Sequence, residues 1–172
     1  MSNEPLERIL DPIESFIVGT IGAPGEREFY LQAKFHGGIH SFAIEKGQVS
    51  ALADRMAVLI GELKAAEYRF ENLIPVNFEV PLIPEFQVGT ISIIWLEESE
   101  QVLIELQELP QTEEGSEITL QLFKLFMSAD IANNFISQSR KVVAAGRLPC
   151  PFCGLPINSN GHLCPRANGY RR

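Results

Sequence analysis

Residues 16–21 read Phe-Ile-Val-Gly-Thr-Ile, and residues 86–91 repeat them as Phe-Gln-Val-Gly-Thr-Ile. The two copies agree at five of six positions and begin 70 residues apart. Self-similarity at a fixed spacing is typical of repeated supersecondary units. The pattern therefore predicts that one unit occurs twice in this chain.

The segments around each copy predict three strands in each half. Apolar and polar residues alternate in residues 29–35, and a second apolar segment at 39–44 follows a Gly37-Gly38 turn. Short runs of this kind, bounded by Gly, Pro and acidic residues, are typical of half-buried strands joined by hairpins. The second half continues with similar runs at residues 92–96, 102–109 and 118–126.

A helix is predicted after the strands of each half, because apolar residues recur there at spacings of three and four. In the second half, Ser128 suits the N-cap position, and Gly146 follows the expected end of the helix. The apolar stripe of the first helix consists of Val49, Leu52, Ala53, Met56, Leu59, Ile60 and Leu63. That of the second consists of Ile131, Phe135, Val142 and Val143.

The sequence therefore predicts an α+β fold in which two β-β-β-α repeats pack as one pseudo-two-fold unit, with a small tail at the C-terminus. Between the repeats, Pro75, Pro81 and Pro84 disfavour a central strand or a helix, which indicates a linker. The predicted segments are a first repeat at 12–70, the linker at 71–85, a second repeat at 86–146 and the tail at 147–172.

Charge separates an acidic body from a basic tail. Residues 1–139 hold eight basic and 22 acidic side chains, whereas residues 140–172 hold six basic ones and no Asp or Glu. Such a tail can dock on its own body or on an acidic partner, and we expect Arg166, Arg171 or Arg172 to contact body carboxylates. Since the net charge of −8 opposes phosphate backbones, we do not expect a nucleic-acid partner.

Composition indicates a soluble globular protein, with 45% hydrophobic and 21% charged residues. No apolar run approaches the length of about 18 residues that a membrane span needs, so we expect no membrane association. Residues 1–11 are rich in charge and lack the apolar block of a secretory signal. We expect a cytoplasmic protein, in which thiols stay reduced and favour metal ligation over disulfides.

The residues with the most distinctive chemistry gather in the tail. All three cysteines of the chain and one of its three histidines follow the order Cys-x2-Cys-x8-His-x-Cys, as Cys150, Cys153, His162 and Cys164. Four ligands of these types suit a structural zinc site, and Gly154 permits the tight turn of a zinc knuckle. His162 and Cys164 lie two residues apart, so both can face one ion from an extended segment. The sequence predicts one structural Zn²⁺ at these four residues.

Two other interpretations of the cysteines remain open. Cys-Pro-Phe-Cys resembles the redox pair of glutaredoxin-type proteins, but that chemistry places the first cysteine at a helix N-terminus after a strand. In this sequence a predicted helix precedes the motif. The thiols can also remain without a ligand.

The remaining motifs are interpreted as structural. Glycine-rich residues 19–25 lack the Gly-Lys-Ser/Thr sequence of a phosphate-binding loop and predict a hairpin turn. Residues 36–40, His-Gly-Gly-Ile-His, predict another hairpin turn with both histidines at its rim. The glutamate pairs at 97–98 and 113–114 are expected to be solvated, and Trp95 is expected in the core or an interface.

The tail sequence resembles an uncharacterised bacterial family, domain of unknown function 3090. It carries Cys-Pro-x-Cys-Gly-Leu-Pro from Cys150 and Gly-His-x-Cys-Pro-Arg-Ala-Asn-Gly-Tyr-Arg-Arg from Gly161. The resemblance extends over nearly the whole chain, including Phe16-x-Val-Gly-Thr and the segments at 25–33 and 45–53. It implies membership of the family and transfers no activity, because the family has none established.

Two classes of function follow from these features. The first is a non-catalytic scaffold or regulatory interaction module for an unknown protein partner, with the zinc tail as its interaction or stability element. The second is an enzyme or a binder of a small phospho-ligand in the cleft between the repeats, with Arg27, His36, His40 or Lys46 as polar contributors. A weak nucleic-acid binder that uses the basic tail is a further alternative. The sequence assigns no catalytic residue and leaves the oligomeric state open.

Overall fold

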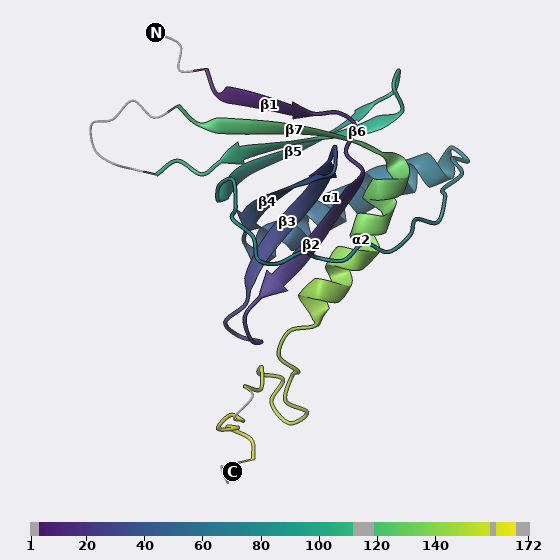
Figure 1. Ribbon diagram of the computed structural model, residues 1–172. Helices are drawn as coiled ribbons and strands as arrows, with labels where there is room; N and C mark the ends of the chain where they lie inside the picture. Colours follow the sequence, from purple (N-terminus) through teal and green to yellow (C-terminus); the bar gives the residue numbers. More distant parts are fainter. Residues whose placement is uncertain (1–3, 112–118, 159–160, 168–172) are drawn as a thin grey trace.

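The computed structural model describes residues 4–111, 119–158 and 161–167. In this part of the chain, seven strands form two sheets and two helices pack beside them (Figure 1). The elements are β1 (Leu6–Leu10), β2 (Ser15–Ile21), β3 (Glu28–Phe35), β4 (Gly38–Ile44), α1 (Lys46–Ala65), β5 (Val88–Leu96), β6 (Gln101–Glu108), β7 (Gln121–Ser128) and α2 (Ala129–Ala144). The predicted α+β class is confirmed.

Each half contains three antiparallel strands followed by a helix. β2, β3 and β4 pair in that order and α1 follows, while β5, β6 and β7 pair in that order and α2 follows. Strands that follow one another closely in the chain pair antiparallel because a hairpin connection allows no other direction. The pseudo-two-fold relation between the two halves stays a prediction.

The sequence does not predict β1. This strand pairs in parallel with β7, so that the larger sheet has the order β1-β7-β6-β5. Only its last residue, Leu10, is buried, and its other side chains are exposed. A strand with so little buried surface leaves no alternating apolar pattern, and its partner comes from the distant end of the body.

Two short segments carry the chain from one sheet to the other. Between β1 and β2, the amide of Ile13 donates to a carbonyl of β7 and the amide of Glu14 to one of β3, both at 2.8 Å. Before β5, the amide of Glu85 donates to β4 at 2.8 Å, and the carbonyl of Phe86 accepts from β4 at 3.0 Å. These bonds hold the two sheets together around one interior.

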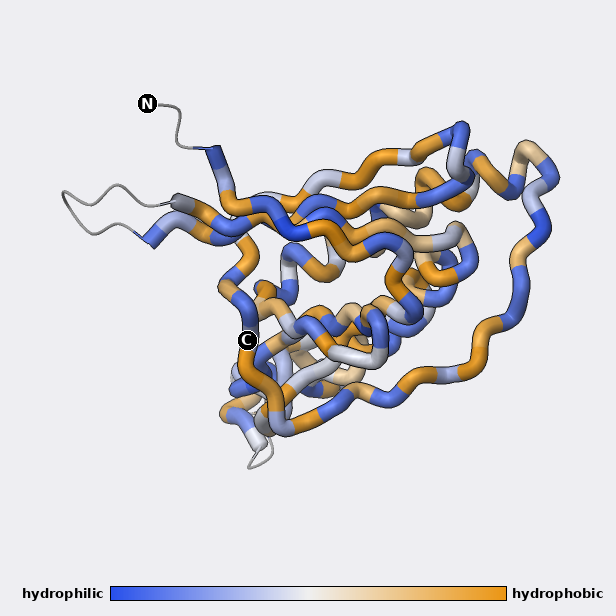
Figure 2. Tube along the Cα trace, turned by 45° about the horizontal axis from the view of Figure 1, so that its top comes forward, coloured by the Kyte–Doolittle hydropathy of each residue, from blue (hydrophilic) through white to orange (hydrophobic). Residues whose placement is uncertain are grey.

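A single hydrophobic core joins both sheets and both helices. At its centre, the ring centroids of Phe42, Phe86 and Phe123 lie between 5.0 and 5.7 Å apart. Phe16 of β2 stacks on Phe135 of α2 at 4.7 Å, which attaches the helix to the smaller sheet. Figure 2 shows hydrophobic and hydrophilic residues alternating along the strands. Burial of these large rings contributes strongly to stability.

Both predicted helices are confirmed. The buried residues of α1 belong to the predicted stripe, and α2 begins after Ser128, whose Oγ accepts from the amide of Ile131 at 3.3 Å. The side chain of Gln48 accepts from the amide of Glu45 at 3.0 Å and so satisfies a donor at the start of α1. No helix in the described residues combines the length and apolarity that a membrane span requires.

Two helix glutamines bind the outer strands of the two sheets. Gln138 of α2 accepts from the amide of Val18 at 3.0 Å and donates to the carbonyl of Val18 at 2.6 Å, on β2. Gln48 of α1 donates to the carbonyls of Val88 and Gly89 on β5, at 3.2 and 3.1 Å. Each side chain therefore occupies backbone groups that an edge strand would otherwise offer to another chain.

The strands β2-β3-β4 form one antiparallel meander and β5-β6-β7 form the other. The repeated sequence contributes to the first strand of each meander, but its two glycines have different neighbours. A Cβ at Gly19 would overlap the ring of Phe78 in the linker. A Cβ at Gly89 would lie 2.9 Å from the Cα of Leu109. Neither position has room for a side chain, because the Phe78 ring packs against Gly19 and the backbone of Leu109 packs against Gly89.

Residues 71–85 contain neither helix nor strand, as their prolines predict. Gln32 of β3 fixes this segment on the smaller sheet. Its side chain donates to the carbonyl of Glu79 at 2.8 Å and accepts from the amide of Glu79 at 2.9 Å. Because Gln32 is buried, these bonds satisfy an amide that water does not reach.

Candidate metal centre

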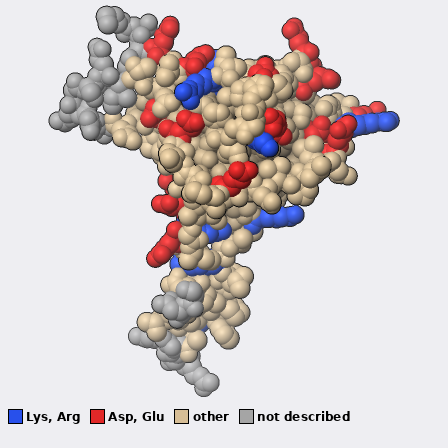
Figure 3. Space-filling view, in the orientation of Figure 1, with Lys and Arg blue, Asp and Glu red and all other residues tan. Residues whose placement is uncertain are grey.

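The tail leaves the body at the end of α2 and projects away from it (Figures 1 and 3). Its backbone first forms a tight turn, in which the amide of Gly154 donates to the carbonyl of Cys150 at 2.8 Å. The amide of Cys150 donates in turn to the carbonyl of Leu155 at 2.7 Å. Gly154 has a φ of 75°, a conformation that glycine adopts at little cost. This turn places Cys150 and Cys153 side by side.

A second turn brings the other two candidates to the first pair. The amide of Gly161 donates to the carbonyl of Asn158 at 2.9 Å, and Gly161 has a φ of 86°. His162 and Cys164 follow directly. The ligand atoms of Cys150, Cys153, His162 and Cys164 then lie within 4.8 Å of one another, so this cluster could hold a metal ion.

The distances within the cluster are close to the edges of a tetrahedral site. The sulfurs of Cys150 and Cys164 lie 3.8 Å apart, and the sulfur of Cys153 lies 3.2 Å from Nε2 of His162. An ion with bonds of about 2.3 Å to sulfur and about 2.0 Å to nitrogen separates its ligand atoms by about 3.5–3.8 Å. A disulfide would require about 2.05 Å between sulfurs. The three thiols are therefore free.

Backbone amides point at two of the sulfurs. The amides of Phe152 and Cys153 donate to the sulfur of Cys150, and the amide of Leu155 donates to that of Cys153. Burial raises the pKa of the Cys150 thiol, but the amides and the neighbouring thiols outweigh it, so this pKa lies below its ordinary value. For Cys153, the Leu155 amide lowers the pKa, whereas burial and the neighbouring thiols raise it above its ordinary value. N–H···S bonds stabilise thiolates, the form that binds metal.

Four protein ligands leave no open coordination position. Catalytic zinc sites keep one position for water or substrate, whereas structural sites use four protein ligands. Cys150 and Cys164 are only 5% and 7% exposed, which restricts access to the centre of the cluster. The redox alternative needs the first cysteine at the start of a helix, but α2 ends at Ala144 and Cys150 lies in a turn.

The two histidines of the body have separate environments. His36 lies in the β3–β4 turn with a φ of 47°, and its ring centroid is 4.2 Å from that of Phe35. His40 is not at the rim of this turn, contrary to the prediction, because it lies within β4. There its Nδ1 is 2.8 Å from Oε1 of Glu85, which also pairs with Arg8 of β1 at 3.6 Å. His40 thus links β4 to Glu85, in the segment that leads from the smaller sheet to β5.

The other motifs of the body have structural positions. Glycine-rich residues 19–25 span the end of β2 and the start of the β2–β3 connection, as predicted. The glutamates at 97–98 are exposed in the β5–β6 turn, while those at 113–114 lie outside the described residues. Trp95 packs against the core from β5.

The predicted docking of Arg166 on the body does not occur among the described residues. Instead, its Nη1 donates to the carbonyl of Phe152 at 3.2 Å, because the second turn of the tail brings Arg166 beside the first. Arg171 and Arg172 lie outside the described residues.

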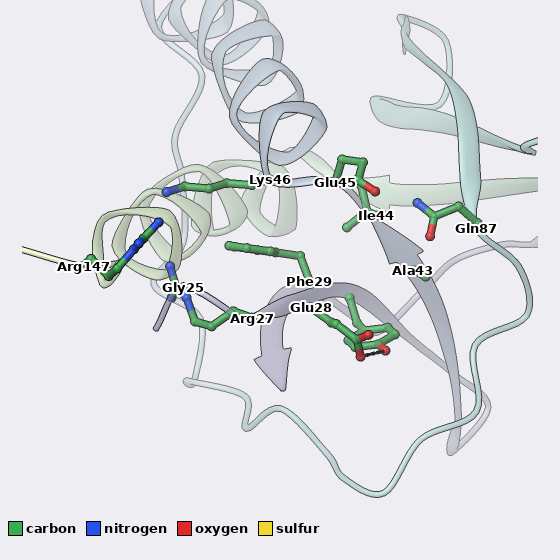
Figure 4. Close-up of a pocket in the computed structure, with 12 residues that line it drawn as sticks. Gly25, Arg27, Glu28, Phe29, Ala43, Ile44, Glu45, Lys46, Gln87 and Arg147 are labelled. Atoms are coloured by element: carbon green, nitrogen blue, oxygen red, sulfur yellow. Dashed lines mark hydrogen bonds between the residues drawn. The ribbon is translucent and has the colours of Figure 1, made fainter. Parts of the chain in front are cut away.

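A cavity of about 380 Å³ lies on the body near the start of α1. Arg27, Lys46 and Arg147 line one end of it (Figure 4). Arg27 and Lys46 are among the sequence-predicted candidates, whereas Arg147 is not. The sequence feature that could have indicated Arg147 is its position directly after Gly146, at the predicted end of the second helix.

Residues 9–164 match the model of a family described as "Protein of unknown function (DUF3090)". The chain belongs to this family. The match to domain of unknown function 3090 includes both meanders and all four residues of the Cys/His cluster. No curated protein and no solved structure matches the chain. For this member of the family, the cluster and the cavity are the features from which a function is inferred.

Proposed function

We propose that this protein binds one structural Zn²⁺ through Cys150, Cys153, His162 and Cys164, and that the ion organises the tail as a non-catalytic interaction module. The observation that carries this proposal is the convergence of four ligand atoms within 4.8 Å. Three thiolates and one imidazole in tetrahedral spacing suit zinc. Because the tail is too small for a core of its own, metal binding would supply the free energy that folds it.

Exposed apolar side chains on the tail support a protein partner. Four large side chains there are between 50% and 86% exposed, namely Leu148, Phe152, Leu155 and Leu163. Exposed apolar groups on a segment held by a metal are suited to binding another protein, because the segment loses little conformational freedom on binding. The role would be that of a scaffold or regulatory protein in the cytoplasm.

Charge disfavours a nucleic-acid partner. Acidic side chains lie over the face of the body that Figure 3 shows, and the net charge is −8. A phosphate backbone that approached the tail would also meet this surface.

The metal half of the proposal is tested by zinc content. Protein purified with reduced thiols should contain one zinc per chain, and Cys153→Ser should lose it because a hydroxyl replaces a thiolate ligand. His36→Ala removes a histidine outside the cluster and should keep the metal. Zinc well below one per chain in the wild type would contradict the proposal.

The interaction half is tested by capture from a native lysate. Phe152→Ser/Leu163→Ser keeps all four ligands and should lose a protein that the wild type captures. Val58→Ser, which changes an exposed side chain of α1, should still capture it. If the double variant captures the same proteins as the wild type, the tail is not the interaction element.

We also propose that the body contains two copies of one β-β-β-α unit related by an approximate two-fold. The proposed boundaries are 12–70 and 86–146 for the units, 71–85 for the linker and 147–172 for the tail. Reciprocal contacts support this relation: β1 pairs in parallel with the third strand of the second unit, and Gln87 pairs in parallel with the third strand of the first. An experimental structure should superpose the two units with Val18 on Val88, and non-equivalent strands at these positions would contradict the duplication.

A further inference from the structure

We propose that the cavity at the start of α1 binds the phosphate group of a small phosphomonoester. Its volume of about 380 Å³ lies within the usual range of small-molecule sites, about 300–1,000 Å³. Three cationic side chains from separate segments line one end (Figure 4). Arg27 comes from the turn before β3, Lys46 from the first turn of α1 and Arg147 from the start of the tail.

The three cations meet around two glycines. A Cβ at Gly146 would lie 3.1 Å from Nη2 of Arg27 and 3.6 Å from Nζ of Lys46. A Cβ at Gly25 would lie 3.3 Å from both Cδ and Nε of Arg147. Figure 4 shows the three side chains ending on the same side of the cavity. The absence of side chains at both glycines leaves room for an anion to reach the nitrogens.

Neighbouring carboxylates do not neutralise these cations. Among the described residues, none of the ion pairs involves Arg27, Lys46 or Arg147. Two glutamates line the cavity, and Figure 4 shows both pointing away from the cations. Glu28 accepts from a neighbouring tyrosine hydroxyl at 2.9 Å, and Glu45 lies at the N-cap of α1.

Capping of α2 explains only part of the cationic cluster. Nη1 of Arg27 donates to the carbonyl of Val142, in the last turn of α2, at 3.1 Å. The C-terminus of a helix carries a partial charge of about −0.5, and the N-terminus of α1, where Lys46 lies, carries about +0.5. The two helix ends therefore offset each other, and the charge of the three side chains remains uncompensated.

A phosphomonoester matches the charge and the shape of the site. It carries a charge of about −1.5 to −2 at neutral pH and three acceptor oxygens. Guanidinium groups bind phosphate oxygens in pairs, and an ammonium group adds a compact charge. A monocarboxylate has a single charge and two oxygens, too few for all three cations. The guanidinium of Arg27 also lies 5.1 Å from the centroid of the Phe29 ring, which supports its orientation.

The cavity extends beyond the cations and can accommodate the organic part of such a ligand. Its other walls combine the apolar side chains of Phe29, Ala43 and Ile44 with polar ones, among them the half-buried Gln87. The tail contributes to the site as well, because Nη1 of Arg147 donates to Oδ1 of Asn158 at 2.6 Å. Arg27 and Lys46 belong to the body, so phosphate binding does not fail if the zinc proposal fails.

Titrations with inorganic phosphate and phenyl phosphate test this inference. The full chain, isolated with its metal, is followed by amide NMR shifts at constant ionic strength. The amides of Gly25, Lys46 and Gly146 should shift saturably. Lys46→Gln and Arg147→Gln should each weaken binding about tenfold or more, because each removes a charge-assisted hydrogen bond. Arg69→Gln, which removes an exposed cation outside the cavity, should leave the affinity unchanged.

Lys46→Gln and Arg147→Gln change exposed side chains. Both variants should give wild-type spectra away from the cavity, which would show that they fold. Shifts that never saturate, that sodium chloride reproduces at equal ionic strength, or that both variants retain would overturn the inference. Benzoate bound as tightly as phenyl phosphate would overturn the phosphate assignment. A short RNA bound more tightly than phenyl phosphate, with the same loss in the variants, would overturn the small-molecule assignment.

Discussion

Gly19 shows how one residue without a side chain fixes the position of the linker. The ring of Phe78 lies where a Cβ of residue 19 would be, and the backbone of the neighbouring residue Glu79 makes two hydrogen bonds with the Gln32 side chain. The linker thus stays on the smaller sheet although it has no regular secondary structure. The glycine of the repeat is needed here for space, because its φ is not in the left-handed region.

Gly19→Ala should lower the free energy of unfolding by about 1–3 kcal/mol, because the added methyl group must displace the Phe78 ring. Gly61→Ala is the matched control. It lies within α1 with nothing within 4 Å of an added Cβ, so it should raise stability by about 0.5–1 kcal/mol. Urea unfolding of the two variants measures both effects. A Gly19→Ala protein as stable as the wild type would contradict the packing described here.

The residue scale also shows why the sequence predicted all four residues of the cluster but only Arg27 and Lys46 among the cations of the cavity. The four residues of the Cys/His cluster lie in one short segment, and two local turns at Gly154 and Gly161 are enough to bring them together. Their spacing therefore carries the information. Arg27, Lys46 and Arg147 come from distant parts of the chain, and only the tertiary fold places them around one cavity.

At the scale of elements, each helix protects a strand at the edge of a sheet through one glutamine. Gln138 pairs with the backbone of Val18 as a neighbouring strand would. Apolar residues at spacings of three and four predicted both helices, and short apolar runs predicted the six strands of the meanders. These patterns could not predict β1, whose side chains are mostly exposed. Nor could they place His40 against Glu85, because that contact depends on how the chain passes from the smaller sheet to β5.

Gln138→Ala should reduce stability by about 1–3 kcal/mol, since the buried amide and carbonyl of Val18 lose their partner. Hydrogen exchange at the Val18 amide should accelerate by more than that of neighbouring β2 amides. Ser137→Ala is the control, because this exposed hydroxyl bonds only within its own helix. Unchanged exchange at Val18 would show that the glutamine does not protect the edge.

At the scale of the whole molecule, the body and the tail depend on different interactions. The hydrophobic core uses both sheets and both helices, and among the described residues it includes none of the tail. The tail has instead its turns and its Cys/His cluster. The body should therefore fold without the metal, whereas the tail should not.

Removal of the metal with a strong chelator should unfold the tail and leave the body folded. Trypsin should then cleave after Arg166 much faster than in the untreated protein, because that residue loses its bond to the Phe152 carbonyl. The thermal unfolding midpoint of the body should change little. Loss of cooperative unfolding in the chelated protein would show that the metal stabilises the body as well.

Generic RNA and DNA should bind the full chain only weakly at physiological salt. The acidic body repels phosphate backbones, and a Debye length of about 8 Å at about 150 mM salt screens residual attraction to the tail. Fluorescence titration measures this affinity. Submicromolar binding that decreases steeply with added salt would place nucleic acid among the partners.

Zinc-edge X-ray absorption spectroscopy of the full-length protein measures the ligand shell itself. We expect three sulfur atoms at about 2.3 Å and one nitrogen at about 2.0–2.1 Å, because the cluster offers three thiolates and one imidazole. Cys164→Ser and His162→Ala, like Cys153→Ser, should each lose the zinc and give no zinc edge above background, because each removes one of the four ligands. A shell of oxygen and nitrogen alone, or one with fewer than three sulfurs in the wild type, would contradict the proposed zinc site.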